Sequence, residues 1–197
     1  NLSGRIRTAD IDWDNNIIYC ASSGGNIWKG SINGENWTSL NDYMQIKGIT
    51  MLRYVQALNR LLIATSYNFY YTDNEGVTIE ISEGLDFLDD DNCSNCNIKR
   101  AIVRESDGSI YLLAENQNIS PWGKVGAIYK SIDNGRTFSK ILTLDSSNGF
   151  DLIQNSDHFD IWTSRYIDGD IFLLNDSKIY VINSFDNIQF VGDLPTT

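Results

Sequence analysis

Short apolar segments alternate with polar segments along the whole chain. The apolar segments are about five residues long and rich in Ile, Leu, Tyr and Val, as at residues 17–21, 61–65 and 110–114. β-branched and aromatic side chains favour strands, and the Gly, Asn and Asp residues between them favour tight turns. No segment shows the period of about 3.6 residues and the capping residues of an amphipathic helix. The pattern therefore predicts an all-β protein.

The predicted strands fall into four groups that share one order. Each group has an upstream strand, two further strands joined by a turn, a polar segment and then a fourth strand, such as 140–144. The upstream strands are predicted at residues 6–11, 49–55, 100–103 and 160–163, and the strand pairs at 17–21 and 25–29, 61–65 and 68–71, 110–114 and 126–130, and 171–174 and 178–182. Residues 84–97 and 115–125 are predicted to be loops inserted into this order.

The polar segments repeat a sequence pattern. The clearest copy is S-I-D-N-G-R-T-F at residues 131–138, residues 72–79 match it in character, and shorter copies stand at 31–37 and 184–190. Successive copies start 41, 59 and 53 residues apart. Four strands per unit at a period of about 40–50 residues is typical of β-propeller blades, whereas a β-sandwich would not explain the same order four times. The predicted blades are residues 1–45, 46–98, 99–150 and 151–197.

The residue types in these segments indicate a role in folding. Hydroxyl, amide and carboxylate side chains can bond the N–H groups of the turn that carries them, and Gly accepts the positive φ that such a turn requires. The aromatic residue that follows is predicted to enter the sheet. The residues interpreted in this way are Ser31, Asn33, Trp37, Thr72, Asn74, Gly76, Thr78, Ser131, Asp133, Gly135, Thr137, Phe138, Ser184, Asp186 and Phe190.

The pattern S-x-D-x-G-x-T-[WF] resembles the Asp box, also called the bacterial neuraminidase repeat. Asp boxes occur in sialidases, in oligoxyloglucan-type glycoside hydrolases and in sortilin-like receptor domains. Residues 3–6 and 16–29 resemble the first blade of the sortilin-like and xyloglucanase-like group, as in large secreted proteins of Bacteroidetes-type bacteria exported by a type IX system. The resemblance covers nearly the whole chain. It implies a secreted or cell-surface protein, and a larger propeller of about six to eight blades in a longer parent chain.

The residues that the resemblance would make catalytic are missing from their places. In the sialidase arginine motif a Pro follows the Ile, but here Arg7 follows Ile6. In the xyloglucanase-like group a catalytic carboxylate precedes a Gly-Gly pair, but here Ser22 and Ser23 precede that pair. No catalytic residue is therefore predicted. We expect a non-catalytic module that binds protein or glycan ligands, with a glycoside hydrolase whose carboxylates lie partly outside this chain as the alternative.

The net charge and the hydropathy of the chain limit the classes of binding partner that we expect. The formal net charge is −11, which disfavours nucleic acid and anionic lipid as partners. The longest apolar runs are far shorter than the roughly 20 residues of a membrane-spanning helix. The expected partners are an extracellular protein or glycan and further blades or domains of the parent chain, with no cofactor. Trp122 and Trp13 are the candidate residues for stacking on a ligand.

The cysteines and one run of acidic residues are candidates for a disulfide and for a metal site. Cys20 is predicted to be a small buried apolar residue, whereas Cys93 and Cys96 form C-x-x-C in a polar loop. A local disulfide in an extracellular protein is favoured there over a zinc site or a redox motif. The run Asp89, Asp90 and Asp91 is an alternative Ca²⁺ ligand set, but the spacing of a calcium loop is missing, so a solvated acidic loop is favoured.

Overall fold

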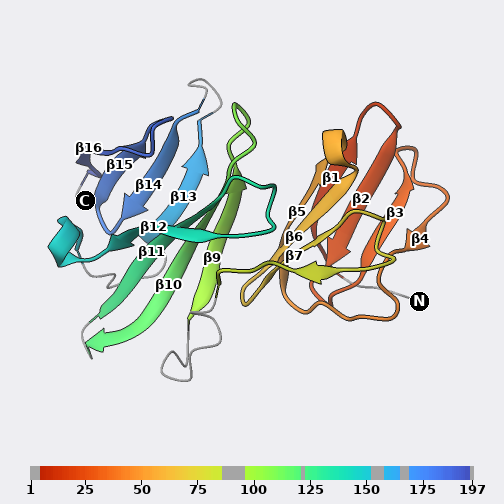
Figure 1. The fold of residues 1–197 in the computed structure, drawn as a ribbon, viewed down its shortest axis with the longest axis horizontal. Helices are drawn as coiled ribbons and strands as arrows, with labels where there is room; N and C mark the ends of the chain where they lie inside the picture. The colour runs from red at the N-terminus through yellow and green to blue at the C-terminus, as the bar shows by residue number, and fades with distance from the viewer. Residues whose placement is uncertain (1–4, 86–95, 121–122, 152–157, 165–168, 196–197) are drawn as a thin grey trace. The chain divides into compact units, whose positions relative to one another are not determined.

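The computed structural model describes residues 5–85, 96–120, 123–151, 158–164 and 169–195. Within these residues the chain forms four antiparallel sheets of four strands each (Figure 1). The strands of every sheet are consecutive in the chain and neighbours in the sheet. The predicted fold class, an all-β propeller with four four-stranded blades in this chain, is confirmed.

The blades follow the order that the sequence pattern predicts. The strands of the first two blades are β1 (Ile6–Asp12), β2 (Ile17–Ser22), β3 (Ile27–Ser31), β4 (Thr38–Ser39), β5 (Ile49–Val55), β6 (Arg60–Thr65), β7 (Phe69–Thr72) and β8 (Glu80–Ile81). The strands of the last two are β9 (Asn97–Val103), β10 (Ile110–Ser120), β11 (Gly123–Ser131), β12 (Ser139–Leu144), β13 (Phe159–Thr163), β14 (Ile171–Asn175), β15 (Lys178–Ile182) and β16 (Ile188–Asp193). Short 3-10 helices lie at η1 (Gln56–Leu58) and η3 (Ser146–Asn148).

One predicted loop is wrong. Residues 115–125 were expected to be irregular, but β10 continues to Ser120 and β11 begins at Gly123. The two strands stay paired beyond the apolar segment, with Asn116 opposite Val125. The hydrogen bonds of an antiparallel ladder join backbone groups, so polar side chains do not end it.

The chain divides into two compact units, Asn1–Ser82 and Glu83–Thr197. The first unit holds the sheets β1–β4 and β5–β8, and the second holds β9–β12 and β13–β16. In Figure 1 the first unit runs from red to yellow and the second from green to blue. Each unit is therefore a pair of blades.

In the first unit the two blades share one layer of buried side chains. Tyr19 and Ile27 of the first blade meet Leu52 and Ile63 of the second in one apolar cluster. The Tyr19 ring stacks on Tyr54, with the ring centroids 4.9 Å apart. Side chains alternate between the two faces of a strand, so Tyr19 and Ala21 on β2, and Leu61 and Ile63 on β6, point into this layer.

The second unit repeats this arrangement. Tyr111 and Leu113 of the third blade pack with Ile161 and Leu173 of the fourth. Gly126 on β11 lies at the closest approach, since a Cβ on it would stand 2.2 Å from Cζ of Phe159. The glycine therefore lets the two sheets pack together.

Polar contacts join the first strands of neighbouring blades in each unit. Thr8 Oγ1 on β1 accepts a hydrogen bond from the Leu52 backbone N–H on β5, and Asp10 accepts one from that of Tyr54 at 2.7 Å. In the second unit Arg100 on β9 donates to both carboxylate oxygens of Asp160 on β13. These contacts fix the edges at which the blades converge.

Replacement of Gly126 by Ala tests the blade contact. The added methyl group would overlap the Phe159 ring, so Gly126→Ala should lower the free energy of unfolding by about 1–3 kcal/mol. Gly192→Ala on β16 is the matched control, because nothing lies within 4 Å of its Cβ position. Urea denaturation followed by tryptophan fluorescence measures both, and equal effects would contradict close packing at Gly126.

Candidate functional site

The turn between β11 and β12 is held together by its own side chains. Ser131 Oγ accepts a hydrogen bond from the Gly135 N–H at 2.9 Å and donates one to Asp133. Asp133 also accepts from the backbone N–H and the hydroxyl of Thr137. Burial alone would raise the pKa of Asp133, but these bonds outweigh it and hold the pKa below its ordinary value. The carboxylate is therefore stabilised as part of the turn.

The turn between β7 and β8 has the same pattern with an amide in place of the acid. Thr72 Oγ1 accepts from the Gly76 N–H at 2.9 Å, and Asn74 Oδ1 accepts from the Thr78 N–H at 2.9 Å. Gly76 has a φ of 85° and Gly135 a φ of 83°. Both turns therefore use Gly at a position that other residues rarely occupy.

The first turn is shorter. Ser31 Oγ accepts from the Glu35 N–H and donates to the Asn33 side chain, so hydroxyl and amide are again used locally. Trp37 donates through Nε1 to the Gly34 carbonyl. Its ring lies over Gly30, where a Cβ would stand 2.7 Å away.

The fourth turn differs from the predicted assignment by one residue. Asn183 Oδ1, not Ser184, accepts the hydrogen bonds from the turn, which come from the Phe185 and Asn187 N–H groups. Asp186 has a φ of 61° and points to other partners. An amide at position 183 satisfies the turn as a hydroxyl would, and this frees Asp186 for an ionic contact.

Two of the three aromatic residues expected to enter the sheet remain half exposed. Phe138 is 5% exposed, but Trp37 is 47% and Phe190 50% exposed. Phe190 contacts the Tyr180 ring edge-on on an outer strand. Phe190 does enter the sheet, since it lies in β16 opposite Tyr180, whereas Trp37 stands one residue before β4.

The remaining sequence candidates lie apart from these turns. Trp13 follows β1 and is 69% exposed. Cys20 is a buried free thiol, and Cys96 is buried and disulfide-bonded. Trp122, Cys93, Asp89, Asp90 and Asp91 lie outside the described residues. Within the residues described, no group of three or more His, Cys, Asp or Glu side chains is placed to hold a metal ion. The same residues contain no helix long and apolar enough to cross a membrane.

Each unit contains one lysine that bridges its two blades. Lys29 on β3 pairs with Glu75 in the β7–β8 turn at 2.6 Å, and Lys130 on β11 pairs with Asp186 in the β15–β16 turn at 2.6 Å. Both acidic residues have positive φ, 54° and 61°. Both lysines stand opposite a buried tyrosine of the preceding strand, Tyr19 for Lys29 and Tyr111 for Lys130. The same kind of contact between blades therefore occurs once inside each unit.

The second unit adds a buried guanidinium to this contact. Arg104 lies over the Tyr111 ring at 4.6 Å and donates to Asp186 at 3.0 Å. It also donates to the Ser184 carbonyl at 3.1 Å. Asp186 therefore neutralises two cations, Arg104 and Lys130, which accounts for an acid at that turn position.

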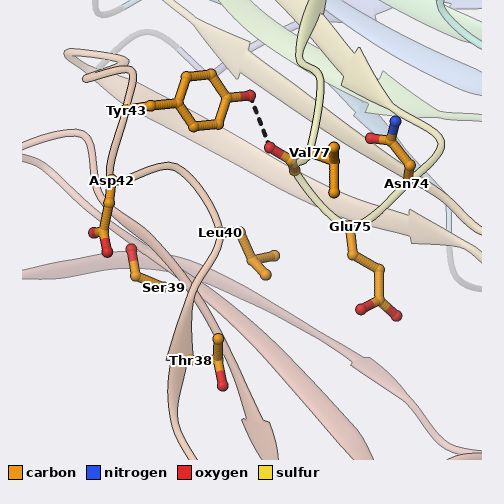
Figure 2. Close-up of a pocket in the computed structure, with 9 residues that line it drawn as sticks. Thr38, Ser39, Leu40, Asp42, Tyr43, Asn74, Glu75 and Val77 are labelled. Atoms are coloured by element: carbon orange, nitrogen blue, oxygen red, sulfur yellow. Dashed lines mark hydrogen bonds between the residues drawn. The ribbon is translucent and has the colours of Figure 1, made fainter.

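The first unit carries an open recess, and Figure 2 shows residues that line it. This groove has a volume of about 550 Å³ and lies between the end of the first blade and the β7–β8 turn. Figure 2 shows Ser39 and Asp42 on one side, Glu75 on the other and Leu40 between them. Its lining residues are Thr38, Ser39, Leu40, Asp42, Tyr43, Asn74, Glu75, Gly76 and Val77. A neighbouring pocket of about 320 Å³ shares Thr38, Leu40 and Glu75 and adds Lys29 and amide side chains.

The short outer strands create the groove. Because β4 ends at Ser39, the chain leaves the sheet edge at Leu40 and turns toward the second blade. Asn41 fixes this segment, since its buried amide accepts from the Ile27 N–H and donates to the carbonyls of Gly25 and Met44. The groove is therefore lined by backbone held in place on both sides.

Gly76 and Tyr43 hold the two sides of the groove together. A Cβ at Gly76 would stand 2.1 Å from the Leu40 carbonyl oxygen, so only Gly fits there. Tyr43 donates its hydroxyl to the Gly76 carbonyl at 2.7 Å, as Figure 2 shows. Partial burial raises the pKa of Tyr43 above its ordinary value.

Sequence reasoning found only one side of the groove. Asn74 and Gly76 were predicted as turn residues, whereas Asp42, Tyr43 and Lys29 were not singled out. The signal that could have found them is the polar segment N-D-Y at 41–43 directly after a strand, since binding residues are concentrated on loops that a rigid scaffold positions.

Comparison with known proteins places the fold. No family model and no curated protein matches the sequence. Among solved structures, YCF48 bound to a D1 peptide matches with a TM-score of 0.58 and 11% identity over 95% of this chain and 53% of that one. An auxiliary nutrient binding protein from Bacteroides thetaiotaomicron matches with a TM-score of 0.58 and 11% identity over 98% and 43%. A candidate 6-phosphogluconolactonase from Bacteroides uniformis matches with a TM-score of 0.53 and 12% identity over 95% and 54%.

These similarities show a β-propeller fold and, at such low identity, the fold alone. The chain spans about half the length of each of these three structures. The role of the groove must therefore be argued from its own residues.

Asp133→Asn tests the acidic turn. The lost charge should lower the free energy of unfolding at pH 7 by about 1–2 kcal/mol, because hydrogen bonds to a charged group are stronger. Since the folded state lowers the pKa of Asp133, the difference from wild type should persist above about pH 4 and vanish as the pH falls through the folded pKa. Urea denaturation from pH 7 to pH 3 measures it. A difference that does not change with pH would contradict this account, and Asp193→Asn, at an exposed position on β16, is the control.

Gly76→Ala tests the closure of the groove. Positive φ alone costs about 1 kcal/mol or slightly more, and Gly34→Ala measures that cost, since Gly34 has a φ of 86° with nothing within 4 Å. Gly76→Ala adds a collision with Leu40 and should cost about 2–4 kcal/mol in all. Equal losses in thermal unfolding would show that Gly76 and Leu40 are not in close contact.

Proposed function

We propose that this chain is a non-catalytic β-propeller module of the Asp-box kind, secreted or displayed on a cell surface, that binds a protein or glycan ligand in the groove of its first unit. The observation that carries the proposal is the groove itself. It is open, built from two blades, and fixed by Asn41, Tyr43 and Gly76. A recess with polar groups on a rigid frame is the usual form of a binding site.

The Asp-box assignment is supported by the turns. In the β7–β8 and β11–β12 turns the hydroxyl and the amide or acid of the repeated pattern bond the turn backbone, with Gly at positive φ. The first turn uses the same residue types in a shorter form. The proposal includes the assignment of this chain to the sortilin-like or xyloglucanase-like group of Asp-box proteins and its export by a type IX system.

Location outside the cytoplasm is supported by Cys96, because disulfides persist mainly in oxidising compartments. Membership of a larger propeller of about six to eight blades is supported by the fourth blade. Trp162, Phe172 and Val181 stand next to one another on β13, β14 and β15, and each is partly exposed. A further blade would cover this apolar face.

Two of the similar structures belong to proteins whose names record binding, one to a peptide and one to a nutrient. Proteins with this fold therefore include ligand-binding proteins. The ligand of this chain has to be inferred from the residues that line its groove. The alternative, a part of a glycoside hydrolase, remains a separate outcome of the experiment below.

Filling the groove tests the proposal. Val77 is 74% exposed at its edge, so Val77→Trp should fold normally and lower ligand affinity by about tenfold or more, because the indole would occupy the ligand's space. Val191→Trp, at an exposed position on β16, is the matched control and should bind as wild type does. Peptide and glycan arrays followed by calorimetry on each hit supply the affinities.

Three outcomes decide the matter. Saturable binding that only Val77→Trp weakens supports the proposal. Release of reducing sugar from xyloglucan or of sialic acid from a sialoside supports the hydrolase instead. Binding that both variants retain, or no binding to either array, contradicts the groove as the site.

A further inference from the structure

We propose that the groove takes an arginine side chain of a protein partner. This inference rests on the proposed function and names the class of ligand. The groove bears carboxylates on two sides, Asp42 and Glu75, and no basic residue is among the nine that line it. Lys29, in the neighbouring pocket, is already paired with Glu75 at 2.6 Å.

The charged atoms left available in the groove, the Asp42 carboxylate oxygens, only accept hydrogen bonds, and the Ser39 hydroxyl can accept as well as donate. Asp42 makes no hydrogen bond or ion pair with any of the described residues, and Ser39 Oγ is buried without a partner among them. Tyr43 and Asn74 have their donors in use, Tyr43 to the Gly76 carbonyl and Asn74 Nδ2 to Thr78. An acceptor-rich site suits a ligand that has only donors, which is the case for guanidinium and ammonium groups.

A neutral sugar suits this lining less well. Each sugar hydroxyl both donates and accepts, so a glycan site normally offers donors such as free amides. The amide of Asn74 is the one amide side chain among the nine lining residues, and both its oxygen and its nitrogen already bond groups of its own turn. The observations therefore favour a cationic ligand over a glycan.

The apolar part of the groove suits the stem of a long side chain. Leu40 lies on its floor, and Val77 and the ring of Tyr43 are exposed at its edge. Arginine and lysine bury their methylene stems along such surfaces while the charged end reaches polar groups. The planar guanidinium also stacks on aromatic faces, which a lysine ammonium does less well.

This chain already binds arginine in the same manner at two internal sites. Arg60 lies 4.6 Å over the Tyr71 ring and pairs with Asp73, and Arg104 lies 4.6 Å over Tyr111 and pairs with Asp186. The groove has the acid and the tyrosine, Asp42 and Tyr43, while the arginine has to come from a partner. The net charge of −11 would also draw a basic partner toward the protein.

A pair of small probes tests the inference on the whole chain. N-acetyl-arginine methylamide and its neutral citrulline analogue have nearly the same shape and differ in charge. Titration of the ¹⁵N-labelled protein with the arginine probe should shift the amide signals of residues 39–43 and 74–77 to saturation. The citrulline probe should bind at least tenfold more weakly, because about tenfold is the smallest effect expected from the loss of one charge-assisted hydrogen bond.

Asp42→Asn should weaken binding of the arginine probe by about tenfold, and Asp193→Asn, the same change at an exposed position on β16 of the other unit, should leave it unchanged. Equal affinity for both probes, loss of affinity in both variants, or shifts confined to other residues would overturn the inference. If the arginine probe fails while a neutral glycan binds and Val77→Trp removes that binding, the ligand class is wrong and the proposed function stands. If no ligand depends on Val77, both are wrong.

Discussion

The packing of one blade on the next is the constraint on which the rest of this structure depends. Each unit holds two sheets that share one layer of alternate side chains, such as Tyr19 with Leu52 and Tyr111 with Ile161. This buried apolar area supplies the main stabilisation. The lysine–acid contacts are partly buried, and the more exposed of them, Lys29–Glu75, adds only about 0–1 kcal/mol. Their importance is geometric, since each one sets the position of a turn against the neighbouring blade.

That geometry explains why the two units differ in what they offer to a ligand. In the second unit the Asp186 carboxylate forms ion pairs with both Lys130 and Arg104, so the charges at that contact between blades are neutralised within the protein. In the first unit Glu75 meets Lys29 alone, and Asp42 across the groove has no described partner. The same fold element is thus a closed structural contact in one unit and an open acidic recess in the other.

Much of the fold could be predicted from the sequence, because a two-residue alternation of apolar side chains and a repeated turn pattern are local signals. The strand order and the hydrogen bonding of Ser131 and Asp133 follow from them. The polar extension of β10 to Ser120 could not be predicted, since ladder hydrogen bonds leave no trace in side-chain character. The groove could not be predicted either. Asp42 and Gly76 are 34 positions apart, and only the packing of two blades brings their segments together.

The two-residue outer strands β4 and β8 have one more consequence. An outer strand of a propeller blade leaves backbone N–H and C=O groups unpaired, and a long row of such groups invites strand-by-strand association with other chains. With only Thr38–Ser39 and Glu80–Ile81 at the rims of the first unit, there is too little backbone for such pairing. The short outer strands that leave room for a ligand side chain therefore also offer little backbone for pairing with a strand of another chain. We expect this edge of the first unit to resist strand-mediated aggregation at high protein concentration.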